Sequence, residues 1–167
     1  MSKKVFLKGT LILACTGLVS RIAGFFYRIF LSHAIGAEGL GLYQLILPLQ
    51  GLMAALSYTG IQSALSRLIA SRLALQEKKE AYFSLVTGIF AAVFFSAVTG
   101  FLLFRHADFF ASTILKAPGT SDLLRLTAAS IPLCAIHSCI DSYYYARKKA
   151  SVPAAVQLSE QAVRIGA

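Results

Sequence analysis

Hydrophobic and polar positions fall into long alternating blocks along this chain. Apolar blocks cover residues 10–35, 40–71, 81–104, 123–146 and 152–167, and charged or turn-forming stretches separate them. A helix of roughly 20 apolar residues crosses the hydrocarbon core of a bilayer, and the first four blocks exceed that length. We therefore predict five helices over these ranges. The fifth, at about 15 residues, is too short to cross a bilayer.

The composition gives the class of protein. Hydrophobic residues make up 57% of the chain and charged residues only 14%, and the mean hydropathy is +0.69. These values lie outside the range of soluble domains. We predict an all-α integral membrane protein whose residues 1–167 are the N-terminal part of a single polytopic membrane domain, truncated within its fifth helix.

The sequences between and within the apolar blocks also predict local structure. A turn is predicted over residues 36–39, Gly-Ala-Glu-Gly. The second block would be roughly 46 Å long as a helix, so we expect it to tilt, to bend near residues 48–51, or to protrude from the ~30 Å core. In the connection 105–122, the segment ADFFASTIL could form an amphipathic helix at the membrane surface, ended by Pro118-Gly119.

The distribution of cations predicts the orientation. Cytoplasmic loops of membrane proteins carry an excess of Lys and Arg, and here alternate loops hold nine cations against two. The net charge of +9 is therefore mainly an orientation signal and not a sign of nucleic-acid binding. The N-terminus is predicted to be cytoplasmic. The nine are Lys3, Lys4, Lys8, Arg72, Lys78, Lys79, Arg147, Lys148 and Lys149, and the two are Arg105 and Lys116.

Two arginines interrupt the first apolar block. Arg21 and Arg28 are seven residues apart, which brings them to within about 20° of one helix face. Counted from residue 10, Arg21 lies roughly 16 Å deep, near the midplane, and Arg28 roughly 27 Å deep. An arginine facing lipid at the midplane costs between ~2.5 and ~17 kcal/mol. We expect Arg21 to face a hydrated cavity in which it meets an anionic ligand; Arg28 could equally reach the outer interface or Glu38.

The fifth block brings a second arginine to a similar depth. Arg164, counted from Pro153, also lies roughly 16 Å deep. It follows Glu160 by four residues, so the two could form an ordinary intrahelical ion pair. Glu160 could instead form an interhelical ion pair with Arg21. Both structural interpretations stand beside a role in ligand binding.

Catalytic and metal-binding motifs do not stand out. Cys134, His137 and Asp141 share a helix face, but this spacing is generic and a polar cap near the cytoplasmic end explains it better than a metal site. The three cysteines suggest no disulfide framework, and a lipoprotein-type cleavage site before Cys15 is disfavoured because the apolar block continues past it. With no nucleotide-binding or protease motif, we expect no enzyme, cofactor or metal.

Two groups of motifs stand out, one near each end of the chain. They are Ser20–Phe25 (SRIAGF) with Gly36–Tyr43 (GAEGLGLY), and Ser142–Lys149 (SYYYARKK) with Val152–Ala154 (VPA) and Glu160–Arg164 (EQAVR). With these motifs the chain resembles the stage V sporulation protein B and polysaccharide-biosynthesis flippases, which belong to the MATE-like superfamily of multidrug, oligosaccharidyl-lipid and polysaccharide exporters. The resemblance covers essentially the whole chain.

The resemblance implies a two-lobed transporter of about fourteen helices, of which this chain supplies four and the start of a fifth. By analogy, the cargo is a polyprenyl-pyrophosphate-linked saccharide, such as a cell-wall precursor, moved across the bacterial cytoplasmic membrane through a cavity between the lobes. The family's first-helix cavity arginine corresponds to Arg21, and a further cation roughly to Arg28.

The hypothesis from the sequence is a non-enzymatic flippase whose cavity residues are Arg21, Arg28, Glu160 and Arg164. Its partners would be the pyrophosphate-linked lipid, the membrane lipids and the missing C-terminal lobe. A multidrug antiporter of the same superfamily is the alternative, although organic cations would favour acidic cavity walls and the spans supply only Glu160 deep inside. A non-transporting membrane scaffold is a third possibility.

Overall fold

The structure, a computed structural model, describes residues 3–166, with side chains at 10–117 and 119–166. Within these residues the secondary structure is helical, without strands. The elements in chain order are α1 (Lys3–Ala54), the π-helical turn η1 (Ala55–Thr59), α2 (Gly60–Ala74), α3 (Lys78–Arg105), α4 (Ala107–Phe109), the π-helical turn η2 (Phe110–Ile114), the 3₁₀ turn η3 (Pro118–Thr120), α5 (Ser121–Ala146) and α6 (Ser151–Gly166).

Three helical stretches in the described part are long and apolar enough to cross a membrane. They are Thr10–Ala74, Lys78–Arg105 and Ser121–Ala146. The first has 65 residues, about three times what one crossing needs, so it can supply two spans. The prediction of an all-α membrane protein is confirmed.

The break in the first stretch is shorter than the turn expected over residues 36–39. Only Gly36 leaves the helical region, at φ 75° and ψ 171°. A residue with a side chain rarely adopts this positive φ, whereas glycine does so without steric cost. The helix resumes at once because Ala37 and Glu38 both favour helical geometry.

The irregularity of the second block lies beyond the expected position. The backbone at Pro48 keeps helical angles inside α1, and the departure from α-helical pairing comes at the π-turn η1. There, the Thr59 hydroxyl donates to the Ala54 carbonyl at 3.1 Å, and Ser57 bonds both the Met53 carbonyl and Thr99 Oγ1 of α3. Hydroxyl groups therefore satisfy polar atoms that the π-turn and its neighbours expose.

The chain divides into two compact units, which are described separately. The first consists of Met1–Leu40 and Tyr144–Ala167, and the second of Gly41–Tyr143. The first unit therefore contains most of the leading part of α1 together with α6. The second contains the end of α1 and the chain through most of α5.

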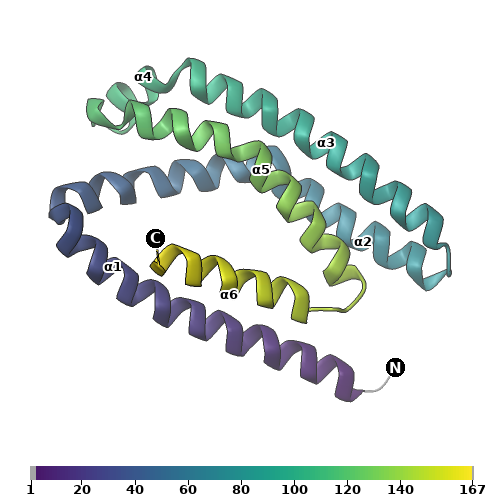
Figure 1. Cartoon of the computed structure of the whole chain (residues 1–167). Helices are drawn as coiled ribbons and strands as arrows, with labels where there is room; N and C mark the ends of the chain where they lie inside the picture. Colours follow the sequence, from purple (N-terminus) through teal and green to yellow (C-terminus); the bar gives the residue numbers. More distant parts are fainter. Residues whose placement is uncertain (1–2, 167) are drawn as a thin grey trace. The chain divides into compact units, whose positions relative to one another are not determined.

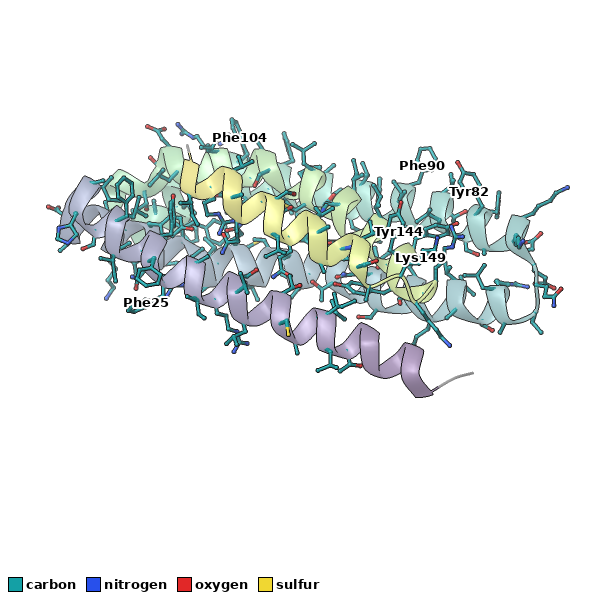
Figure 2. The ribbon with its side chains drawn as sticks, turned by 60° about the horizontal axis from the view of Figure 1, so that its bottom comes forward. Phe25, Tyr82, Phe90, Phe104, Tyr144 and Lys149 are labelled. Atoms are coloured by element: carbon teal, nitrogen blue, oxygen red, sulfur yellow. The ribbon has the colours of Figure 1, made fainter. Side chains whose placement is uncertain are left out.

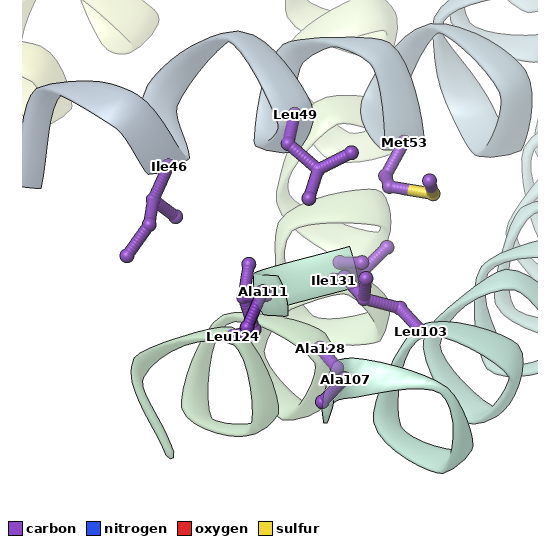
Figure 3. Packing of buried hydrophobic residues seen from close by; sticks show 9 residues of the cluster. All are labelled: Ile46, Leu49, Met53, Leu103, Ala107, Ala111, Leu124, Ala128 and Ile131. Carbon is purple, nitrogen blue, oxygen red and sulfur yellow. The ribbon is translucent and has the colours of Figure 1, made fainter. Parts of the chain in front are cut away.

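The second unit has a closed hydrophobic core (Figure 3). It joins three helical segments: the end of α1, the end of α3 with the α4–η2 turn, and the first half of α5. The segment 107–114, expected at the surface, contributes Ala107 and Ala111 to this core. The buried members are Ile46, Leu49, Met53, Leu103, Ala107, Ala111, Leu124, Ala128 and Ile131.

Glycine permits close helix packing in this unit. A Cβ at Gly100 of α3 would lie 2.9 Å from the backbone oxygen of Ala128 in α5, closer than van der Waals contact allows. Polar bridges add to the packing: Ser142 Oγ donates to the Gln62 carbonyl at 3.2 Å. Close backbone approach at small residues, with hydroxyl bridges, is typical of helix packing in membranes.

Two helices end with the same capping geometry. Gln76 after α2 and Lys148 after α5 have positive φ, at 61° and 58°. The next amide bonds back five residues in each case, Glu77 to the Arg72 carbonyl at 3.0 Å and Lys149 to the Tyr144 carbonyl at 3.0 Å. This is the Schellman pattern, in which glycine usually occupies the left-handed position.

Candidate functional site

The candidate residues all lie in the first unit, where α6 runs alongside the leading part of α1 and in the same direction (Figure 1). The contact face of α1 consists of residues three or four apart, as expected for one side of a helix. Thr16 and Ser20 are buried on it, with 7% and 8% exposure, and Gly24, Tyr27 and Leu31 are half-buried.

A polar contact joins the two helices. The side-chain amide of Gln161 in α6 donates a hydrogen bond to the Ser20 carbonyl of α1 at 2.9 Å. A Cβ at Gly24 would lie 3.5 Å from the same amide nitrogen, an ordinary contact distance. The turn of α1 between Ser20 and Gly24 therefore receives the amide without steric conflict, and Arg21 belongs to this turn.

Arg21 and Arg28 are both exposed and lie beside the contact face, not on it. At ~100° per residue, each is roughly 100° around the helix from the line of Ser20 and Tyr27. Beyond them lies the exposed apolar face of α1, from which Phe25 projects (Figure 2). The two arginines thus mark the edge between the surface covered by α6 and the surface left apolar.

These arginines have no bonded partner within residues 3–166. Neither Arg21 nor Arg28 forms a hydrogen bond or an ion pair with another described residue. Two arginines of the second unit are paired: Arg72 with Glu77 at 2.9 Å, and Arg125 with Asp108 at 2.9 Å. The ion pair between Arg21 and Glu160 that the sequence allowed is not formed here.

The α6 candidates, Glu160 and Arg164, are exposed as well. Glu160 takes part in an interaction, but Arg164 forms no ion pair within the described chain. The intrahelical pair that their four-residue spacing allowed is therefore absent here. The structure brings all four predicted residues into one two-helix unit without joining them to one another.

Ser20 and Gln161 form the α1–α6 hydrogen bond, and neither was predicted as a site residue. Ser20 Oγ is buried without a hydrogen-bond partner among the described atoms, and its carbonyl accepts from Gln161. The available signal was a glutamine inside an apolar helix, because such amides often bond across helix pairs in membranes. Both residues lie inside motifs that the sequence analysis quoted.

The model of the polysaccharide biosynthesis protein family matches residues 6–167. The chain belongs to this family. Stage V sporulation protein B of Bacillus subtilis (strain 168) is 34% identical over 170 aligned positions, covering 99% of this chain and 32% of that relative. No solved structure matches the chain significantly.

The family assignment confirms the resemblance inferred from the motifs and supports a multi-pass membrane protein. The chain spans about a third of the length of the curated relative that it matches.

The remaining polar cluster lies in α5 of the second unit. His137 Nδ1 is 3.9 Å from Asp141 Oδ2, one helical turn away. No three His, Cys, Asp or Glu side chains in the described region come together as a metal site, so Cys134 does not complete one with this pair. An intrahelical polar contact accounts for the arrangement.

Proposed function

We propose that this polysaccharide biosynthesis family member forms part of a flippase that moves a polyprenyl-pyrophosphate-linked oligosaccharide, or a similar cell-wall precursor, across the bacterial cytoplasmic membrane. The observation that carries the proposal is Arg21: an exposed arginine in a membrane-spanning stretch, without a bonded partner in the described chain. The family membership supplies the class of cargo.

The cost of burying charge explains why Arg21 points to a ligand. A guanidinium facing hydrocarbon is expensive, so arginines within spans face cavities or partners. Arg21 lies at the edge of the α1–α6 contact and has no carboxylate beside it. An anion entering from a hydrated cavity could supply the missing partner. The planar guanidinium donates paired hydrogen bonds that fit phosphate oxygens and stays charged at any physiological pH.

The other three candidates have supporting roles in this proposal. Arg28 lies on the same side of α1 as Arg21, two turns further along, and could contact the second phosphate or the first sugar. Glu160 and Arg164 would line the same cavity from α6 and could accept and donate hydrogen bonds to saccharide hydroxyls. The sugar would pass through the cavity while the polyprenyl tail stays in the bilayer.

The proposed transport cycle follows the general scheme of secondary transporters, in which a midplane site opens to each side in turn. The N-terminus lies in the cytoplasm, as the loop cations indicate. Binding and release, with no covalent step, account for the cargo's movement, so the protein is a transporter and not an enzyme.

The test uses the intact protein, reconstituted into liposomes with a lipid-linked saccharide, and compares Arg21→Ala, Arg21→Lys and Arg67→Ala. Arg67 is a matched control, because it is an exposed, unpaired arginine of α2 in the described chain. A hydrogen bond to a charged group contributes about 1.5–3 kcal/mol, so Arg21→Ala should slow translocation about 10–100-fold. Arg21→Lys should lose less, and Arg67→Ala should behave as wild type.

Two results would contradict the proposal. One is normal translocation, or normal complementation of a flippase-null strain, by Arg21→Ala at wild-type protein abundance. The other is export of organic cations without precursor translocation, which would identify the multidrug alternative. A protein that does neither, yet is stably inserted, would favour a scaffold.

A further inference from the structure

A groove between α2 and α3 is not used by the proposed transport mechanism. It has a volume of about 590 Å³ and lies wholly within the second unit. Its walls are apolar apart from Ser84 and Thr87, and Ser84 already donates to the Glu80 carbonyl at 2.8 Å. The site therefore suits a hydrocarbon chain better than a polar ligand.

The groove owes its floor to a glycine. A Cβ at Gly88 would lie 2.7 Å from Leu65 Cδ1, so its absence lets Leu65 lie directly against α3. Leu65 is 4% exposed and forms the floor, while Leu68 and Phe83 form exposed rims. The result is an open apolar channel along a helix pair that crosses the membrane.

The length of the groove and its position along α3 match one leaflet of a bilayer. From Phe83 to Ala91 it extends along α3 for about 12 Å, close to half of the ~30 Å hydrocarbon core. Tyr82 borders its end and projects outward from α3, as does Phe90 further along (Figure 2). Tyrosines favour the membrane–water interface, so Tyr82 places the interface at the end of the groove.

Positive charge lies just beyond that end. The α2–α3 turn carries an internal ion pair between Arg72 and Glu77, which leaves Lys78 and Lys79 against the single carboxylate of Glu80. Both lysines are exposed, and neither side chain forms a hydrogen bond or an ion pair in the described chain. Ammonium groups at this level complement a phosphodiester, and each basic residue near an anionic leaflet contributes about 1 kcal/mol.

We propose that the α2–α3 groove binds one anionic phospholipid, with an acyl chain against Leu65, Leu68 and Thr87 and its phosphate at Lys78 and Lys79. The position of the groove in the membrane, its apolar lining and the positive charge near its end all favour this ligand. The site is separate from Arg21, which belongs to the other unit, and the proposal is independent of the transported cargo.

The test is photo-crosslinking of the intact protein in nanodiscs that contain phosphatidylglycerol with a diazirine in its acyl chain. Peptide mapping should place the label within residues 61–68 and 83–91. Ala91→Phe fills the groove and should reduce this label about tenfold, equivalent to a tenfold weaker binding constant. Ala97→Phe is the control, because Ala97 is exposed on α3 about 120° away.

A second pair of variants covers the case in which Ala91→Phe disturbs folding. Ala64→Leu narrows the groove from α2 and should also reduce the label. Lys78→Gln combined with Lys79→Gln should abolish the preference for phosphatidylglycerol over phosphatidylcholine, whereas Arg105→Gln at the other end of α3 should preserve it.

Three outcomes would overturn the proposal. The label could be unchanged in both groove variants, which would make it nonspecific lipid contact. Undecaprenyl phosphate, but not phosphatidylglycerol, could compete for the label, which would assign the groove to the tail of the cargo. The label could also be absent from residues 61–68 and 83–91 of the wild-type protein, which would show that the groove is closed to lipid.

Discussion

The two units of this chain differ in the bonding of several polar groups, although Arg67 of the second unit is unpaired in the described chain, as Arg21 of the first unit is. In the second unit, Arg125 bonds Asp108 and Asp122 at 2.9 Å and 3.2 Å, and Ser142 bridges to α2. In the first unit, Arg21 and Arg28 are exposed and unbonded in the described chain, and Ser20 Oγ is buried without a partner among the described atoms.

The hydrophobic packing differs in the same direction. Three helical segments of the second unit meet in a closed core (Figure 3). The first unit has one helix pair, although large apolar side chains more than 60% exposed occur in both units, such as Phe30 in the first and Phe90 in the second. The difference teaches that the second unit is held together by a packed core of three helical segments, whereas the first unit depends on one helix pair that carries Arg21 and Arg28 at its edge.

The largest effect should come from crowding the scaffold. Gly100→Ala puts a methyl group 2.9 Å from the Ala128 carbonyl oxygen, and rigid backbone cannot yield easily. We expect a loss of about 1–3 kcal/mol in the free energy of unfolding, measured by thermal unfolding in detergent. Gly51→Ala is the control, because nothing lies within 4 Å of its added Cβ. Equal behaviour of the two variants would contradict the close α3–α5 packing.

A smaller effect should come from loosening the first unit. Gln161→Leu removes the hydrogen bond to the Ser20 carbonyl, and interhelical hydrogen bonds in membranes contribute about 0.6 kcal/mol on average. We expect faster hydrogen–deuterium exchange in α6 without loss of the fold. Gln157→Leu, an exposed glutamine one turn earlier on α6, should leave exchange unchanged. If both variants exchange alike, the Gln161 contact does not hold the pair.

The smallest effect should be the same in both units. Gln76→Gly and Lys148→Gly each place glycine at a left-handed position now held by a residue with a side chain. We expect each to raise the free energy of unfolding by up to about 1 kcal/mol, measured in the same thermal assay. Glycine at the neighbouring Lys149 should give no gain. A gain in one unit alone would show that helix capping, too, differs between the units.

Most of the helical pattern was readable from the sequence. Long apolar blocks require helices in a membrane because backbone polar groups must be satisfied internally, and α3 and α5 enclose the apolar blocks at 81–104 and 123–146. A turn was expected over all of residues 36–39, because this segment contains two glycines. In the structure, only Gly36 leaves helical geometry. The π-turn at Ala55–Thr59 has no sequence signature that we could use.

The candidate site was readable only in part. Arg21 stood out because a charge within a membrane span is costly. Its depth near the midplane predicted that it faces a hydrated cavity and not lipid. Whether Glu160 and Arg164 form an ion pair could not be predicted, because a four-residue spacing permits such a pair without requiring one. Gln161 was missed because a side-chain amide gives no indication of which helix it will contact.

The sequence by itself determined that this protein is a helical membrane protein with two arginines in its first span, because hydropathy and charge act over whole segments and do not depend on the fold. Only the tertiary structure decided that Gln161 contacts Ser20, that Arg21 lies beside this contact, and that Gly88 leaves a groove between α2 and α3. These features depend on distances of a few ångströms between residues far apart in the chain, which local pattern does not encode.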